Sequence, residues 1–127
     1  MKSLKLHEWA WVAGIIEGEG CFSTTKKHPN PCFQIQMKDE DVIAKLAEML
    51  GTKYTKRPPR NDRCQPMYQT MVRRQNFCEW LITGIYRWMG ERRQAKLNEC
   101  IAYYQSKGSN ACDHLLLGNN TEPMCAL

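Results

Sequence analysis

The sequence lacks any apolar run long enough to span a membrane. The apolar stretch that follows Glu8 is interrupted by Glu17, whereas a spanning helix needs about 20 apolar residues in succession. These two carboxylates, together with the absence of a small-residue cleavage site, also argue against a secretory signal. We therefore expect an intracellular protein that is neither secreted nor attached to a membrane.

Closely spaced cysteine pairs are lacking as well. The chain has seven cysteines, an odd number, and no Cys-x-x-Cys pair, so neither a disulfide framework nor a zinc ribbon is expected. A metal site built from Cys112, Asp113, His114 and distant Cys125 is a minor alternative, because this spacing matches no structural zinc pattern. We interpret the cysteines as free thiols in a reducing compartment.

Acidic residues are scarce in one long stretch of the chain. The formal net charge is +5, and between Thr52 and Lys96 eleven Lys or Arg residues stand against only Asp62, Glu79 and Glu91. A basic excess confined to part of a domain indicates a polyanion such as nucleic acid as the partner. The alternative is a solvated surface that only keeps the protein soluble.

The length of 127 residues fits a single domain with one core. Hydrophobic periodicity and turn residues predict the order helix, hairpin, helix, hairpin, helix, helix. From Gly108 onward no period is clear, so we expect one domain over 1–107 and a tail or loosely packed extension over 108–127. The expected strands are 20–27, 32–38, 52–57 and 67–74, and the first two helices are 7–18 and 40–50.

The first predicted helix combines a small-residue face with acids at its end. Ala10, Gly14 and Gly18 recur at every fourth residue, so they lie along one helix face. Small side chains on such a face allow a second helix to approach closely. Glu17 and Glu19 then follow at the end of the expected contact.

The run from Val12 to Gly20 resembles the nine-residue motif that names the LAGLIDADG homing endonucleases. Val stands for the first Leu of the motif, Ile for the second, and Glu occupies both acidic positions. The order of elements from about residue 6 to residue 104 is also similar to the αββαββα core of that family. The resemblance implies an α+β fold in which a four-stranded antiparallel sheet binds DNA on one face and packs against helices with the other.

The same resemblance implies a chemistry and assigns residues to it. It implies a site-specific DNA endonuclease that makes a Mg²⁺-dependent double-strand break. Glu19 falls on the family's metal-binding acid, the Gly18 carbonyl is a second candidate ligand for Mg²⁺, and Glu17 is expected to support the helix end. Further catalytic polar groups are sought among Gln36, Arg92 and Arg93.

Polar residues without any acid are expected on the free face of the sheet. Gln and Arg can pair with the edges of adenine and guanine in the major groove, while Lys holds phosphates. The parity of the third strand is ambiguous, and we select Lys56 and Arg57 there. A polar face that is simply hydrated is the alternative. The candidate DNA-binding residues are Lys26, Gln34, Gln36, Lys38, Lys56, Arg57, Gln69 and Arg73.

A single copy of the motif implies a homodimer of the single-motif type. Its two first helices would pack through Ala10, Ala13, Gly14 and Gly18, and its double-stranded DNA target would be palindromic or nearly so. Two other hypotheses stay open. One is a non-cleaving nucleic-acid-binding relative, either an intron maturase or a repressor. The other is a small dimeric scaffold whose basic surface contacts only protein.

Overall fold

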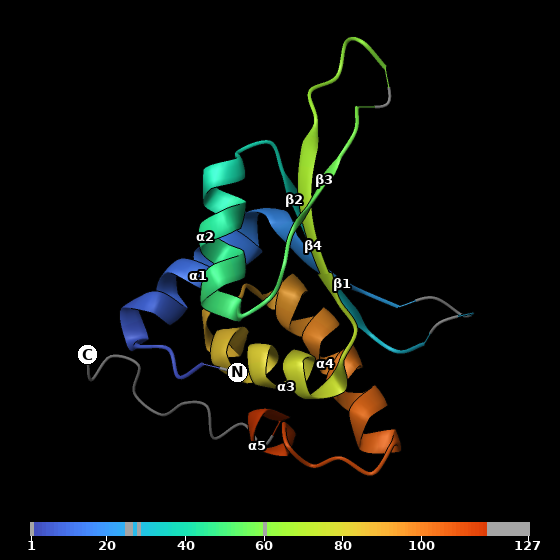
Figure 1. Ribbon diagram of the computed structural model, residues 1–127. Helices are drawn as coiled ribbons and strands as arrows, with labels where there is room; N and C mark the ends of the chain where they lie inside the picture. Colours follow the sequence, from blue (N-terminus) through green and yellow to red (C-terminus); the bar gives the residue numbers. More distant parts are fainter. Residues whose placement is uncertain (1, 25–26, 28, 60, 117–127) are drawn as a thin grey trace.

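The computed structural model describes residues 2–24, 27, 29–59 and 61–116, and it has the predicted α+β architecture (Figure 1). Four antiparallel strands form one sheet in the order β1-β2-β4-β3. The predicted order of helices and hairpins is confirmed. The elements are α1 (Leu6–Glu19), β1 (Gly20–Ser23), β2 (Cys32–Met37), α2 (Glu40–Leu50), β3 (Thr55–Arg57), β4 (Met67–Val72), α3 (Gln75–Ile85), the 3₁₀ turn η1 (Tyr86–Trp88), α4 (Glu91–Ser106) and α5 (Asp113–Leu116).

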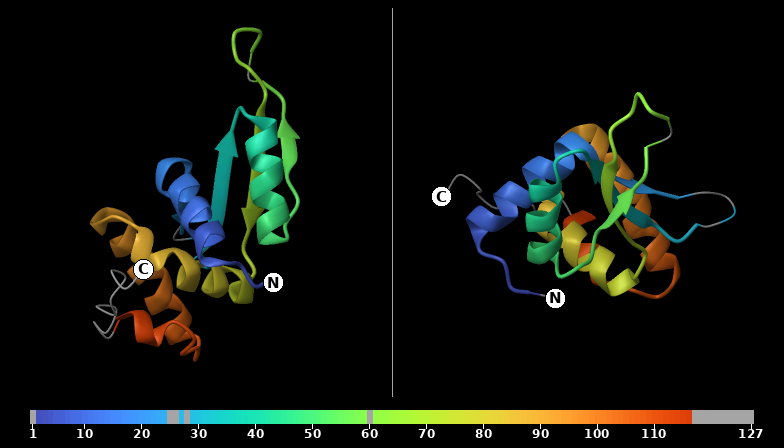
Figure 2. Two further views of the ribbon diagram at one scale, coloured as in Figure 1. Left: turned by 90° about the vertical axis from the view of Figure 1, so that its left-hand side faces the viewer. Right: turned by 45° about the horizontal axis from the view of Figure 1, so that its top comes forward.

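One face of the sheet packs against helices because β2 alternates in polarity. Phe33, Ile35 and Met37 are buried, whereas Gln34 and Gln36 on the opposite face are partly exposed. The right-hand view of Figure 2 shows α1 and α2 together on one side of the strands. The core therefore lies between the sheet and the helices, and the polar face is left open.

The predicted ends of α2 agree with the structure. Asp39 precedes the helix in an extended conformation. Gly51 ends it with a φ of +70°, in the left-handed region that favours glycine. The N–H of Thr52 then donates to the carbonyl of Ala47 at 2.9 Å, which satisfies one of the last carbonyls of the helix.

All four strands are shorter than the sequence predicts, and the difference is largest for β1 and β3. β1 ends at Ser23 and β3 begins only at Thr55. Before β3, the Thr70 hydroxyl of β4 donates to the carbonyl of Lys53 at 2.6 Å and lies 3.1 Å from the hydroxyl of Thr52. A side chain thus takes the place of ladder hydrogen bonds, which is why the strand starts late.

The described part of the predicted extension is packed. Cys112 is 2% exposed and Leu115 is 9% exposed, and the Ser109 hydroxyl donates to the carboxylate of Glu79 on α3. Residues 109–116 therefore add a short helix to the core, where the sequence shows no period. Residues 117–127 lie outside the described residues, and the division at residue 107 stays a prediction.

The structure also bears on the predictions about cysteines and membrane-spanning segments. The six cysteines in the described part of the chain are free thiols, as predicted. None of the helices over the described residues is both long and apolar enough to cross a membrane.

Candidate nucleic-acid interface and metal site

The strand register gathers polar side chains on the face of the sheet that carries no helix. Gln36 of β2 pairs with Gln69 of β4. Arg57 of β3 pairs with Met67, which lies two residues before Gln69 on β4 and therefore on the same face. Residues directly opposite each other in an antiparallel pair point to the same face. Gln34, Gln36, Arg57 and Gln69 therefore lie together, as the sequence predicts for this set.

These four side chains form a hydrogen-bonded cluster centred on one atom. The Gln69 Oε1 accepts from Gln36 Nε2 at 2.6 Å and from Arg57 Nη1 at 3.0 Å. Gln34 Nε2 donates to the same oxygen at 3.4 Å. We call Gln34, Gln36, Arg57 and Gln69 the Gln69 cluster. It crosses three strands, so it fixes side chains that would otherwise move separately.

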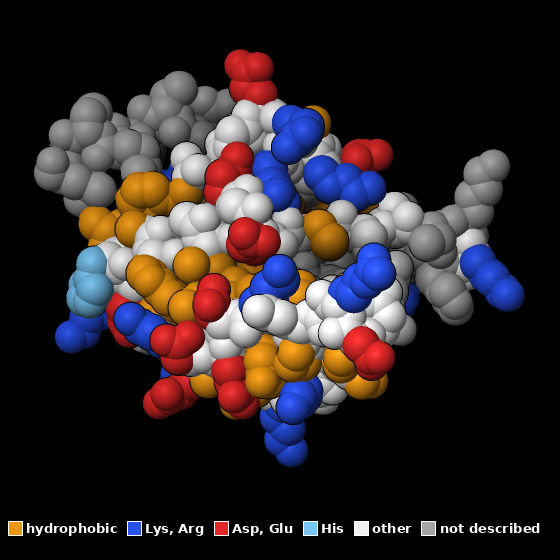
Figure 3. Space-filling model, turned by 90° about the horizontal axis from the view of Figure 1, so that it is seen from above, with side chains coloured by type: hydrophobic (Ala, Val, Ile, Leu, Met, Phe, Trp, Pro, Cys, Tyr) orange, Lys and Arg blue, Asp and Glu red, His pale blue; other side chains and the backbone are white. Residues whose placement is uncertain are grey.

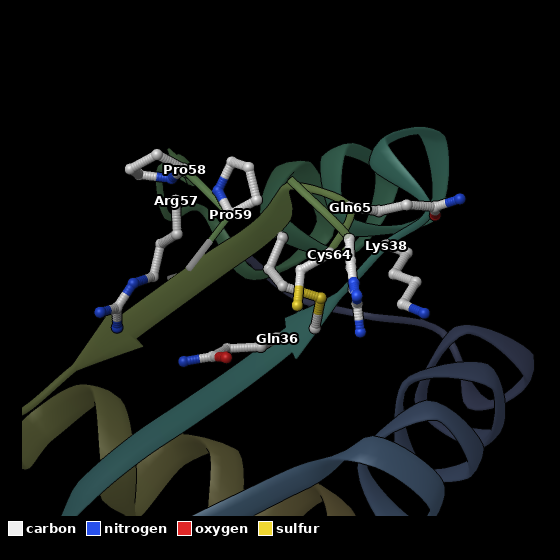
Figure 4. Close-up of a pocket in the computed structure, with 9 residues that line it drawn as sticks. Gln36, Lys38, Arg57, Pro58, Pro59, Cys64 and Gln65 are labelled. Atoms are coloured by element: carbon white, nitrogen blue, oxygen red, sulfur yellow. The ribbon is translucent and has the colours of Figure 1, made fainter. Parts of the chain in front are cut away.

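A basic hollow of about 530 Å³ lies beside the Gln69 cluster (Figure 4). Gln36 lies on β2 and Lys38 directly follows that strand. Arg57 lies at the end of β3, and Arg63 lies in the loop between β3 and β4. This loop runs past the end of the sheet at the top of Figure 1. Among the described residues no carboxylate lines the hollow, so it suits an anionic group. The rest of its lining is Pro58, Pro59, Cys64, Gln65 and Met67.

A second, more open basic hollow lies at the other end of β4. Its lining includes Lys53, Arg73 and Arg74 together with the exposed Met71, and again contains no described acid. The predicted residue Arg73 therefore lies just beyond the end of β4 and apart from the Gln69 cluster. The two hollows place positive charge at both ends of the polar face.

One predicted DNA-binding residue, Lys56, does not lie on this face. Lys56 pairs with Tyr68, whose neighbour across the ladder is the buried Met37, so the pleat directs Lys56 to the helix-bearing side. Of the two residues selected on the third strand, only Arg57 has the predicted direction. Lys26 lies outside the described residues.

Glu19 is the last residue of α1 and is exposed. Glu19 directly precedes Gly20, which pairs with Ile35, the residue next to Gln36 on β2. The neighbouring Met37 is only 8% exposed. The predicted acid and the predicted amide thus lie at the same end of the polar face.

Glu17 and Arg93 tie the end of α1 to the start of α4. Arg93 donates from Nη1 to the carbonyl of Gly20, and its Nε lies 3.9 Å from Glu17 Oε2. The same carboxylate oxygen accepts from the N–H of Gly90 at 3.4 Å. Glu17 therefore supports the helix junction, as predicted. Arg92 is exposed, and its side chain makes no hydrogen bond or ion pair within the described part of the chain.

The oxygen donors at the end of α1 are of the type that Mg²⁺ prefers. A carboxylate and a backbone carbonyl are hard ligands, and both Glu19 and Gly18 are exposed. Over the residues that the structure describes, no three His, Cys, Asp or Glu side chains come together to hold a metal. The set fits Mg²⁺ only as part of a larger site to which other groups contribute.

The small-residue face of α1 is open. A Cβ added at Gly14 or Gly18 would meet no atom within 4 Å, and Ala10 is partly exposed. Ala13, in contrast, is 1% exposed and packs in the core of its own chain, so it does not belong to the predicted contact face. Figure 3 shows hydrophobic side chains gathered on the left flank, the side on which Figure 1 places α1.

Only the comparison with solved structures finds a protein similar to this chain. No family model matches the chain, and no curated protein matches it. Among solved structures, the chain is similar to the archaeal intron-encoded homing endonuclease I-Vdi141I in complex with DNA, with a TM-score of 0.56 and 19% identity. The match covers 73% of this chain and 64% of that chain. The chain has a homing-endonuclease fold.

Within this homing-endonuclease fold, sequence reasoning missed several basic residues of the two hollows. Arg63 lies in a loop without periodicity, and Lys53 and Arg74 flank strands. The general excess of Lys and Arg over residues 52–96 was the only available signal for them. Which of these residues would line a hollow depends on how the loop folds back over β2.

Proposed function

We propose that this protein is a site-specific DNA endonuclease that binds a palindromic or near-palindromic duplex as a homodimer and makes a Mg²⁺-dependent double-strand break. The observation that carries the proposal is the position of Glu19. An exposed carboxylate stands at the end of a sheet face that presents Gln, Arg and Lys side chains.

DNA binding is supported by the chemistry of the polar face. Arg and Gln side chains can form paired hydrogen bonds with guanine and adenine edges in the major groove. Lys38, Arg63 and the cations of the second hollow are placed to contact phosphates on either side. The fold is shared with a homing endonuclease whose structure was solved with DNA.

Cleavage is supported by the groups at the end of α1. Glu19 and the Gly18 carbonyl would hold Mg²⁺, which when bound offsets the negative charge of the scissile phosphate and lowers the pKa of a coordinated water. Gln36 lies beside this end of the sheet and can orient a phosphate or a water by hydrogen bonding. Arg92 is free to approach the DNA backbone. Arg93 is engaged with Gly20 and Glu17, so we assign it to holding the junction.

A homodimer is supported by the open face of α1 and by the single acid. One chain contributes one carboxylate at this point, and a second copy docked through Gly14 and Gly18 would bring a second Glu19 near the two-fold axis. Each copy would then read one half of the target, which is why the target should be symmetric.

A non-cleaving DNA- or RNA-binding relative is the second candidate. It is favoured by Glu91, an acid in the first turn of α4, where the LAGLIDADG endonucleases that the sequence resembles usually carry a basic group. The polar face would then bind nucleic acid while Glu19 served no catalytic purpose.

The test combines selection for binding with a cleavage assay. A pool of randomised duplexes is selected for binding to the wild-type protein, and the recovered sequence is placed in a plasmid. We expect wild type to linearise this plasmid with Mg²⁺ and to leave it intact with EDTA. Glu19→Gln should bind the same duplex without cutting it, because the amide keeps the size of the side chain but removes the charge.

A matched control tests whether removing the charge of any exposed glutamate has the same effect. Glu48 is an exposed glutamate of α2, and Glu48→Gln should cut as wild type does. Equal cutting by Glu19→Gln would overturn the assignment of the metal ligand. Selective binding by wild type without any Mg²⁺-dependent break would establish the non-cleaving alternative instead.

A further inference from the structure

The Gln69 cluster fixes which way its amide groups face. The oxygen and nitrogen of a glutamine amide have nearly the same shape, so their order follows from their partners. An arginine guanidinium carries only donors. The Gln69 atom that meets Arg57 Nη1 at 3.0 Å must therefore be the oxygen.

The orientation of the Gln69 amide also determines that of Gln36 on β2. Because Gln69 presents an oxygen, the Gln36 atom at 2.6 Å from it must be the donor Nε2. An amide oxygen has two lone pairs, and these two contacts occupy both, which agrees with the longer 3.4 Å separation to Gln34. Among the described residues, Gln36 Oε1 is left as a free acceptor, while Gln69 Nε2 and the rest of the Arg57 guanidinium are left as free donors.

Gln69 itself is not part of the basic hollow that its partners line. Arg57 and Gln36 both contribute to the hollow, and Arg57 is exposed on the edge strand β3. A long exposed side chain loses rotamer freedom when it binds. The bond to Gln69 restricts the Arg57 side chain before any ligand arrives, so less freedom is lost on binding.

We propose that Gln69 is a positioning residue for base recognition, which holds the Arg57 guanidinium in the direction from which it reads guanine. The inference rests on the proposed function, since it concerns the same DNA-reading face. Arg57 would donate two hydrogen bonds to O6 and N7 of a guanine in the major groove. Gln69 would act through Arg57 rather than by its own contact with that base.

The test uses binding selection from a pool of randomised duplexes, followed by sequencing. Arg57→Leu first identifies the base position that Arg57 specifies. We expect wild type to prefer guanine there by about tenfold or more, as good bidentate pairs do. Gln69→Leu should reduce this preference to less than about twofold while binding to a non-selected duplex stays near wild type, because Arg57 keeps its charge but loses its direction.

Gln69→Glu and Tyr68→Phe separate the positioning of Arg57 from other effects of substitution on β4. A carboxylate still accepts the hydrogen bond from Arg57, so Gln69→Glu should keep the guanine preference although its added negative charge weakens total binding. Tyr68 lies on the same strand but on the helix-bearing face, outside the proposed DNA-binding surface, and Tyr68→Phe should keep both. If Gln69→Leu does not fold, Gln69→Glu decides, and loss of the guanine preference in that variant overturns the inference.

The remaining outcomes distinguish this inference from the proposed function. Wild type that selects no sequence would contradict both. Wild type that selects a sequence, with Gln69→Leu keeping the guanine preference, would overturn only the positioning role of Gln69. The inference is also overturned if Arg57→Leu alters no base position.

Discussion

At the scale of single residues, neighbouring side chains on α4 have different surroundings. Arg93 donates to the Gly20 carbonyl and lies close to Glu17, whereas Arg92 points into solvent. Both were equal candidates from the sequence, because one residue of spacing turns a helical side chain by about 100°. Only the packing of α4 against the end of α1 separates a structural arginine from one that is free to meet DNA.

Replacing each arginine by alanine tests this separation. Arg93→Ala should lower the free energy of unfolding by about 1–2 kcal/mol, because a carbonyl loses its charged donor at the junction. Arg92→Ala should leave stability within about 0.5 kcal/mol of wild type, as exposed substitutions usually do. Urea unfolding followed by circular dichroism measures both, and equal stabilities of the two variants would contradict the distinction.

Gly84 shows a close approach that only glycine permits. A Cβ at this position of α3 would lie 2.2 Å from the Trp9 ring of α1, and that ring also packs 5.0 Å from the Trp80 ring. We expect Gly84→Ala to destabilise the protein by about 1–3 kcal/mol through overpacking. Ala102→Gly on the exposed side of α4 is a useful comparison, since its effect of about 1 kcal/mol comes from helix propensity alone. A melting temperature of Gly84→Ala at or above that of wild type would contradict the described contact of α1 with α3.

At the scale of elements, α1 has two faces with different tasks. Val12 and Ile16 are buried in the core, while Gly14 and Gly18 leave open space. Two glycines in one helix cost helix stability, so an open glycine face is expected to have a compensating contact. The proposed dimer supplies it.

A larger side chain at Gly14 should prevent dimer formation without lowering the stability of the fold. Gly14→Leu adds a good helix former at an open position, so the melting temperature of the isolated chain should not fall. In the proposed dimer the same side chain would hold two helices apart, and sedimentation should show a monomer. Ala102→Leu, at an exposed position of α4, should remain dimeric as wild type does. A dimer in the Gly14→Leu variant would place the interface elsewhere.

α4 carries a buried thiol that makes stability depend on pH. Burial raises the pKa of Cys100 from 9.0 to about 12, so the folded protein keeps a proton that the unfolded chain releases in this interval. The stabilisation is complete below pH 9 and is lost as pH rises toward about 12, by about 1.4 kcal/mol per pH unit.

Removing the thiol should remove this part of the pH dependence. In urea unfolding at about pH 8 and about pH 10.5, the stability difference between wild type and Cys100→Ala should narrow by about 2 kcal/mol at the higher pH. Ionisable groups that do not interact with Cys100 are the same in both proteins, so their contributions cancel in the comparison. A constant difference would mean that Cys100 ionises freely in the folded state.

At the scale of the whole molecule, two basic hollows frame one polar sheet face. Phosphate contacts release counterions, so log K should fall linearly with log salt concentration, by about 0.9 for each contact on duplex DNA. We expect Arg63→Gln and Lys38→Gln each to reduce this slope by about 1 and to weaken binding to all sequences alike. Fluorescence anisotropy over a salt series measures the slope. DNA binding that is independent of salt would instead favour a scaffold that contacts only protein.

Most of the architecture was predictable from local patterns. The alternation of Phe33, Ile35 and Met37 determined which side of β2 faces the core, and Gly51 marked the end of α2. The short strand β3 and the helix α5 were not predictable in the same way. Their limits depend on Thr70 binding the segment before β3 and on Ser109 binding Glu79, contacts between residues far apart in the chain.

The sequence by itself determined the order of elements, the polar character of one sheet face and the position of Glu19 at the end of α1, because each follows from residues a few positions apart. The tertiary structure decided the rest. Strand register separated Arg57 from Lys56 and joined Gln34, Gln36, Arg57 and Gln69 on one oxygen. Helix packing buried Ala13 while leaving Gly14 open. Such choices arise from contacts between distant segments, and a change of register by one residue would reverse the face of every side chain on a strand.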